Sequence, residues 1–411
     1  MSDAGVLRPA KTGLKAAAIR FILQHIDALF RLLRIVRPIA HVAGVVIVTR
    51  HDDVREALLA DDHFAAPYKD KLDVIMDGEP FMLGLAYTPD YRLAVAAMRK
   101  VVRAEDVHAR LAKGFGDRAA AAVAAAGGRI EVVDALSRTV TFEVFCDYFG
   151  VGDPPGQDLK AITTRLFEFQ FLDPSNEPAL RQEVDVMART LRDHVDATIA
   201  ARRQSGKAVD DVLGRSLVLA GQGEPGFSDL QIRSALIGFL VGGLPQPPIV
   251  APQVLDQLLR RPAALAGAQG AAIADDDELL ARYVLEAMRF DPLGPGVRRL
   301  VIKDHTLAAG TARAATIKAG QTMLVASRSA MRDGRRIPRP ECFDPDRLPH
   351  EYMYFGEGLH ACFATEINKA VLPQMLKPLL RARRLKRAPG RLGRLTKRGF
   401  LADQLWVDYS A

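Results

Sequence analysis

The spacing of apolar residues changes several times along this chain and predicts an order of strands and helices. The run from Val42 to Thr49 is rich in β-branched residues and predicts a strand. A helix with an acidic start is predicted next, over 50–59. From about residue 90 to 225 the apolar residues recur with helical spacing, whereas the stretch from 297 to 325 favours strands, with glycines at its turns.

Two segments inside the helical part have a clear character. The alanine-rich stretch 118–126 predicts a helix that ends at Gly127, and 139–149 predicts a buried helix. No repeat and no linker of low complexity divides the chain. We therefore predict a mainly α fold with small β-sheets (α+β) in a single domain, 1–411, with an N-terminal segment and helix in 1–40 and a core in 41–411.

A later helix is predicted to break in its middle. It begins with Ser228 as a cap and continues with an apolar face, but Pro245, Pro247 and Pro248 follow within four residues. A proline inside a helix removes a backbone hydrogen bond and costs about 3 kcal/mol. The carbonyl groups freed by the break, such as that of Val241, need other partners.

Composition limits the kind of protein. The chain has 411 residues and is 49% hydrophobic, which is ample for a large core. Its three cysteines fit a reducing cytosol better than a disulfide scaffold. The first apolar stretches are broken by charges, and the uncharged run 42–49 is too short to cross a bilayer. We expect a cytoplasmic protein with no membrane anchor.

Basic residues gather near the end of the chain. The stretch 381–398 holds nine of them and no acid, and the whole chain has a net charge of +7. Nucleic acid is disfavoured as a partner because this stretch has no aromatic residue to stack on bases. A solvated surface loop is the favoured interpretation, and a docking patch for an acidic redox partner stays open.

The run 354–364 is the most informative stretch of the sequence. A glycine-rich turn leads to Cys362, and a helical pattern follows. Backbone N–H groups of such a turn can stabilise a thiolate. Two other interpretations are a buried structural thiol and a zinc site, although the spacing fits no zinc template. The zinc ligands would be Cys342, His350, His360 and Cys362.

A second constellation lies on a predicted helix that begins near Asp276 and ends before Pro292. Glu286 and Arg289 stand three residues apart on this helix, so they share a face and can pair. A buried pair is costly unless a third group completes its hydrogen bonds.

Together these motifs resemble the cytochrome P450 family. Its pattern Phe-x-x-Gly-x-x-x-Cys-x-Gly is matched at Phe355, Gly358 and Cys362, whereas Ala364 replaces the last glycine. A Glu-x-x-Arg pair some 70 residues earlier is also usual in the family. The resemblance implies a P450 fold shaped like a triangular prism, and haem b (iron protoporphyrin IX) with the Cys362 thiolate as axial iron ligand.

The resemblance also assigns supporting residues. Arg347 would complete a structural clamp with Glu286 and Arg289 behind the haem. The haem propionates and the surrounding loop would be held by residues of several segments, with Tyr91 as a possible substitute hydroxyl near Arg99. These cofactor-binding candidates are His360, Arg299 or its neighbour Arg298, Arg99, Phe355 and Gly356.

The pattern departs from the family over the opposite face of the haem. Monooxygenases of the family carry Ala-Gly-x-(Asp/Glu)-Thr there, and the acid and hydroxyl relay protons. Aligned on Gly243, those two positions are Pro245 and Gln246 in this chain. The segment looks like that of haem-thiolate domains that isomerise fatty-acid hydroperoxides, so the candidate catalytic residues are Gln246 and Gly243.

Three functions therefore stay open. The family default is a monooxygenase that inserts oxygen into an apolar small molecule and takes electrons from a ferredoxin-type donor. The missing acid–alcohol pair favours a peroxygenase or hydroperoxide isomerase instead. A haem sensor or carrier without turnover is the third. The predicted substrate pocket is apolar; it consists of Phe239, Leu240, Gly243, Leu244, Leu293 and Val297, with Met82 and Leu83 in support.

Overall fold

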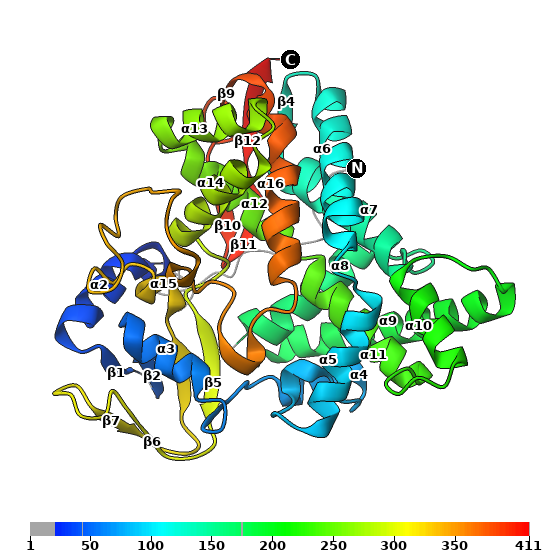
Figure 1. Ribbon diagram of the computed structural model, residues 1–411, viewed down its shortest axis with the longest axis horizontal. Coiled ribbons are helices and arrows are strands. Elements are labelled where there is room, and N and C mark those ends of the chain that lie inside the picture. The colour runs from blue at the N-terminus through cyan, green and yellow to red at the C-terminus, as the bar shows by residue number, and fades with distance from the viewer. Residues whose placement is uncertain (1–20, 43, 174–175, 411) are drawn as a thin grey trace.

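The computed structural model describes residues 21–42, 44–173 and 176–410. The strands within 39–48 and 297–325 lie with short helices at one side of the molecule, whereas the strands near the C-terminus lie among the longer helices (Figure 1). The helices are α2 (Ile26–Val36), α3 (His51–Leu59), α4 (Lys69–Met76), α5 (Pro89–Val101), α6 (Lys113–Ala126), α7 (Thr139–Phe149), α8 (Leu159–Phe167), α9 (Pro178–Ser205), α10 (Val212–Gly221), α11 (Asp229–Gly243), α12 (Pro247–Leu259), α13 (Pro262–Ile273), α14 (Asp277–Phe290), α15 (Ser327–Ala330) and α16 (Thr365–Arg381).

The largest sheet has five strands in the order β1-β2-β8-β5-β3. Only the β2–β8 pair is parallel, and its register places Val46 opposite Met323. A three-stranded sheet has the order β4-β12-β9, and two further pairs are β6–β7 and β10–β11. The strands are β1 (Ile39–Val42), β2 (Val45–Val48), β3 (Phe64–Ala65), β4 (Arg129–Glu131), β5 (Val297–Val301), β6 (His305–Leu307), β7 (Ala315–Ile317), β8 (Thr322–Val325), β9 (Arg383–Arg387), β10 (Thr396–Arg398), β11 (Leu401–Gln404) and β12 (Trp406–Ser410).

The first predicted strand is wrong in its extent. The structure has a strand over Val45–Val48, and the residues before it form a hairpin partner, β1. The chain reverses near Gly44, whose φ of 81° is a left-handed conformation that glycine adopts without strain. The β-branched pattern identified the strand but could not separate it from its partner.

The predicted helices over 50–59, 118–126 and 139–149 are confirmed within a few residues as α3, α6 and α7. Helix α6 ends at Gly127 with φ of 61°, as its glycine predicted. Asp276 accepts a hydrogen bond from Leu279 N–H and caps α14. The strand-rich pattern from 297 to 325 is confirmed by β5 to β8.

The predicted break in the long apolar helix is confirmed between α11 and α12. Ser228 caps the first helix in a capping box with Gln231. Pro247 and Pro248 stand in the first turn of α12, where a missing N–H costs little. Because prolines have no N–H, the carbonyls of Val241, Gly243 and Leu244 cannot accept the bond from the residue four positions later.

The basic stretch 381–398 is only partly a loop, which corrects the expectation: 388–395 has no helix or strand, but the residues on either side do. It contains the end of α16, strand β9 and strand β10. Several of its cations are paired with acids of other segments: Arg387 with Asp256 at 2.7 Å and Lys397 with Asp291 at 2.7 Å. The pairing of β12 with β9 could not be predicted from the local sequence, because the two strands come from separate segments.

The segment Asp229–Leu259 is long and apolar enough to cross a membrane by length and composition alone. However, 72% of its most apolar window is buried inside the structure, as expected for a core helix. It is interrupted at 244–246 and contacts α7, α8 and α9.

Candidate haem-thiolate site

Glu286 and Arg289 form a fully buried ion pair on α14. The Arg289 Nε and Nη2 atoms donate to the two carboxylate oxygens of Glu286 at 2.8 and 2.6 Å. Both side chains are 0% exposed. Such a pair is favourable only when all of its polar atoms find partners.

The structure brings Arg347 to this pair and completes those hydrogen bonds. Arg347 Nε donates to Glu286 Oε1 at 3.2 Å, and the Tyr352 hydroxyl donates to Oε2 at 3.2 Å. The two guanidinium groups donate to backbone carbonyls of 331–342, including that of Cys342, which accepts from both. The cluster therefore fixes the segment that leads into the cysteine loop. Tyr352 was missed in the sequence, where a single tyrosine carries no pattern.

The cysteine loop closes on itself. Cys362 N–H donates to the Phe355 carbonyl at 2.8 Å. Gly356 and Gly358 have φ of 70° and 74°, so both positions need glycine. Ala364 has φ of −91° and ψ of 21°, a conformation open to any residue. The departure from the family pattern at Ala364 therefore causes no backbone strain.

The Cys362 thiol has opposing influences. Burial raises the pKa of the thiol, and hydrogen bonding from the backbone N–H of Ala364 opposes this shift without reversing it. The Thr365 hydroxyl donates to the Cys362 carbonyl at 2.7 Å and so fixes the start of the following helix. A bound metal cation would favour the thiolate over the thiol, because the thiolate is the form that binds a metal. Thr365, the first residue of α16, was not singled out in the sequence.

Two residues from the first quarter of the chain hold the peptide of Leu359, three residues before the cysteine. Asp61 Oδ2 accepts from Leu359 N–H at 2.9 Å, and the Tyr91 hydroxyl donates to the Leu359 carbonyl at 2.6 Å. The loop also approaches closely, since a Cβ on Gly358 would lie 2.7 Å from the Leu58 carbonyl oxygen. Tyr91 was expected near the haem, whereas Asp61 was missed, because its contact spans 298 residues.

Replacing Asp61 with Ala should loosen this loop. The partly buried Leu359 N–H would lose its acceptor, which costs at most about 1–3 kcal/mol, the figure for a fully buried donor. Urea denaturation of the haem-loaded protein measures the loss. The matched control is Asp62→Ala, since the Asp62 side chain is 70% exposed. Equal stability of the two variants would show that the Asp61 contact does not support the loop.

His360 and Arg299 approach each other at the edge of the cysteine loop. Burial first, and then the charge of Arg299, lower the His360 pKa to about 4, so its ring is neutral at pH 7. Arg299 lies on β5 and is only 3% exposed. Neighbouring residues of a strand point to opposite faces. Of the two arginines offered by the sequence, Arg299 is the one whose charge lowers the His360 pKa.

Arg99 lies beside the loop on α5. Its guanidinium carbon is 5.3 Å from the ring centroid of Phe363, the residue that follows Cys362 in the sequence. Arg99 is exposed, in contrast to Arg299. Phe363 also contacts Phe239 of α11, with ring centroids 5.8 Å apart. Helices α5 and α11 therefore both reach the cysteine loop.

Two observations fit a haem between the cysteine loop and α11. The Nε atom of Arg299 is buried and has no hydrogen-bond partner among the described residues, and an acid such as a propionate would supply one. In α11, a Cβ added to Gly242 would meet no atom within 4 Å, although the nearby Val241 and Leu244 are buried. An anionic group at Arg299 and open space at Gly242 are what the cofactor needs.

Gln246 lies at the break between α11 and α12. Gln246 is half-buried, and its carbonyl accepts from Ile249 and Val250 N–H. No hydrogen bond within 21–42, 44–173 and 176–410 involves its side-chain amide. A Cβ added to Gly243 would lie 3.7 Å from the Phe145 ring, so this position borders the core. Gln246 is thus the polar side chain left available at the break.

The predicted substrate pocket is only partly placed as expected. Four of the predicted pocket residues are half-buried and so retain surface that a substrate could contact: Met82, Leu83, Leu293 and Val297. Leu240 is 0% exposed and belongs to the main core, so its assignment to the pocket is wrong. Leu244 and Phe239 are almost as buried, at 4% and 8%. The amphipathic pattern cannot separate a residue that faces a pocket from one that faces the core.

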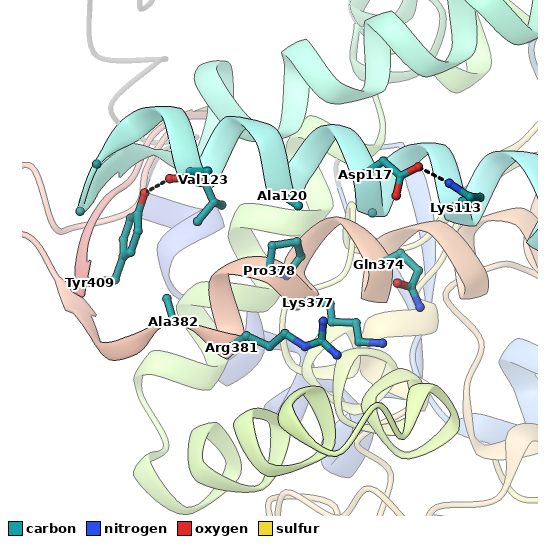
Figure 2. Close-up of a pocket in the computed structure, with 14 residues that line it drawn as sticks. Lys113, Asp117, Ala120, Val123, Gln374, Lys377, Pro378, Arg381, Ala382 and Tyr409 are labelled. Carbon is teal, nitrogen blue, oxygen red and sulfur yellow. Dashed lines mark hydrogen bonds and ion pairs between the residues drawn. The ribbon is translucent and has the colours of Figure 1, made fainter. Parts of the chain in front are cut away.

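A cavity of about 580 Å³ lies elsewhere, between α6 and α16 (Figure 2). None of the predicted site residues lines it. Its cations are already paired, Lys113 with Asp117 and Lys377 with Asp277. The four side chains considered as zinc ligands do not gather either: no group of three or more His, Cys, Asp or Glu in the described part of the chain could hold a metal ion.

Comparison with known proteins gives the same family. The cytochrome P450 family model matches residues 275–396. The chain is 28% identical over 357 residues to mycinamicin IV hydroxylase/epoxidase of Micromonospora griseorubida, which covers 84% of this chain and 83% of that protein. The structure named CalO2 superposes with a TM-score of 0.80 at 19% identity, over 95% of this chain and 97% of that one.

A more local similarity points to a fungal protein. Psi-producing oxygenase A of Emericella nidulans is 38% identical over 121 residues, which are 29% of this chain and 11% of that protein. This chain therefore spans only about a tenth of that relative.

The chain belongs to the cytochrome P450 family and has its fold. Members of this family bind haem b. The chain is an oxidoreductase of the monooxygenase type.

Proposed function

We propose that this chain is a haem-thiolate oxidoreductase that inserts oxygen into an apolar small molecule. The observation that carries the proposal is the cysteine loop, in which Gly356 and Gly358 turn the chain tightly before Cys362 and the cluster of Glu286, Arg289 and Arg347 holds the segment that leads into it. When bound, the haem would supply an iron whose thiolate ligand donates electron density and favours cleavage of an O–O bond.

The residues of the chain would bind and orient the cofactor and the substrate. Arg299 would pair with a propionate through its free Nε, and the neutral ring of His360 would add a hydrogen bond beside it. Glu286, Arg289 and Arg347 would keep the loop rigid from behind. Half-buried apolar side chains such as Leu293 and Val297 would contact the substrate and exclude water.

A second candidate function uses a peroxide or an organic hydroperoxide as the oxygen source. It is favoured by the segment 241–248, which has no carboxylate or hydroxyl to relay protons. The Gln246 amide can donate a hydrogen bond to a hydroperoxide but cannot readily release a proton at neutral pH. The freed carbonyls of Gly243 and Leu244 can accept the hydroperoxide O–H. The local similarity to a fungal oxygenase supports this candidate.

Turnover under two conditions separates the candidates. The haem-loaded protein is given an apolar test substrate with a ferredoxin, its reductase and NAD(P)H, or it is given a fatty-acid hydroperoxide without electrons. Oxygen insertion only in the first reaction supports the ferredoxin-dependent monooxygenase. Turnover only in the second supports the peroxide-type enzyme. No turnover in either would contradict both and leave a haem carrier or sensor.

We further propose that the protein acts in the cytoplasm.

Replacing Gln246 with Ala tests the role of this amide. If the amide holds a hydroperoxide, the rate with that substrate should fall by about 10²-fold, as for the loss of one preorganised donor. Rates and product ratios are measured by chromatography. Gln222→Ala, at an exposed glutamine, serves as the control. An unchanged rate and product pattern in Gln246→Ala would remove Gln246 from the site.

A further inference from the structure

One face of the N-terminal helix region is apolar and exposed. Of the large hydrophobic side chains that are exposed in the described residues, a cluster lies on α2 and the residues just before it. We call this cluster the α2 stripe; it consists of Phe21, Ile22, Leu29, Leu32, Ile35 and Val36. Leu29, Leu32 and Val36 follow one another at helical spacing of three and four residues. The side chains of Leu32 and Ile35 are 57% and 63% exposed.

The opposite face of the same helix is firmly held, so the α2 stripe is directed away from the protein. Ile26 and Phe30 are buried with Ala326. Arg34 donates to the Ser329 hydroxyl at 2.9 Å, and Asp27 accepts from Arg328 at 2.7 Å. The helix lies at one edge of the molecule beside β1 and β2 (Figure 1). The stripe is thus a fixed outer surface.

Positive charge is concentrated in the N-terminal part of the sequence. The first 42 residues contain seven Lys and Arg and two Asp, a net charge of +5 out of +7 for the whole chain. Arg31 and Arg37 are exposed on or next to α2, and no acid among the described residues pairs with them. A second copy of the chain would bring the same positive charge against this one, so self-association through the stripe is opposed.

We propose that the α2 stripe docks on the surface of an anionic phospholipid bilayer. An apolar helix face flanked by arginines is the pattern of helices that lie in the membrane interface. The apolar side chains would enter the boundary between headgroups and acyl chains, and Arg31 and Arg37 would meet the lipid phosphates. The contact is peripheral, so it is compatible with the absence of a spanning anchor that the sequence predicts. It does not depend on the proposed function.

Vesicle flotation of the full, haem-loaded chain tests the proposal. The protein should float with vesicles of phosphatidylglycerol and phosphatidylcholine, and binding should fall at least tenfold with phosphatidylcholine alone or in high salt. The double variant Leu32→Ser/Ile35→Ser should also lose at least tenfold in binding. The matched control is Val209→Ser/Val218→Ser, which removes two valines that are 43% and 58% exposed elsewhere.

The other results would overturn the proposal. Failure of the unaltered protein to float, or equal binding by the two double variants, excludes the stripe as a lipid-binding surface. Sedimentation velocity tests the competing occupant: a dimer of the unaltered chain that Leu32→Ser/Ile35→Ser dissociates would assign the stripe to a second copy. Circular dichroism and the haem absorbance confirm that both variants are folded, so a loss of binding is not a loss of structure.

Discussion

Replacing Cys362 with Ser is expected to abolish turnover while the protein still folds. The serine hydroxyl has nearly the same size but is not ionised at neutral pH, so the anionic ligand is lost. The decrease in turnover should be at least about 100-fold. Loss of a residue that only supports a metal ligand already costs up to about 100-fold, and Cys362 would be the ligand itself. Turnover per haem and the visible spectrum of the purified variant provide the measurement.

Cys342→Ser is the matched control for this experiment. Cys342 is also a free cysteine but is exposed, and its contacts to Arg289 and Arg347 come from its backbone carbonyl. This control should keep the spectrum and the activity of the unaltered chain. A Cys362→Ser variant that turns over at the original rate would remove Cys362 from the chemistry.

The second large effect is expected at Glu286. Its carboxylate accepts from Arg289, Arg347 and Tyr352. Its replacement by Gln leaves the buried Arg289 without a countercharge and leaves Arg347 with only Glu351, 3.6 Å away. Breaking a buried pair in this way costs about 3–5 kcal/mol. Urea denaturation should show this loss, and haem content after purification should fall because the cysteine loop is no longer held.

Glu341→Gln provides the comparison for this loss of stability. Glu341 pairs with Arg332 at 3.3 Å, but its side chain is 67% exposed. An exposed pair contributes about 0–1 kcal/mol. Similar stability losses in the two Glu→Gln variants would contradict the role of Glu286 as the centre of the clamp.

The sequence predicted the parts of the site that depend on local spacing. Glu286 and Arg289 share a helix turn, and the Cys362 loop is a short pattern of glycines and one cysteine, so both could be recognised along the chain. The helix break at Pro245 was also predictable, because proline acts through its own covalent structure.

Contacts between distant segments could not be predicted in the same way. Asp61 meets Leu359 across 298 residues, and no pattern at Asp61 marks that contact. The full burial of Leu240 depends on which neighbours cover α11, so the apolar pattern assigned it to a pocket instead. Residues 383–387 form a strand because β12 pairs with β9, a pairing that depends on tertiary structure.

The difference spectrum of the ferrous protein with carbon monoxide tests the central claim most directly. We predict a band of thiolate type for the unaltered chain, because Cys362 supplies the axial ligand. A spectrum of imidazole type, or no haem-dependent band after reconstitution with haem b, would contradict the assignment of Cys362 as the iron ligand.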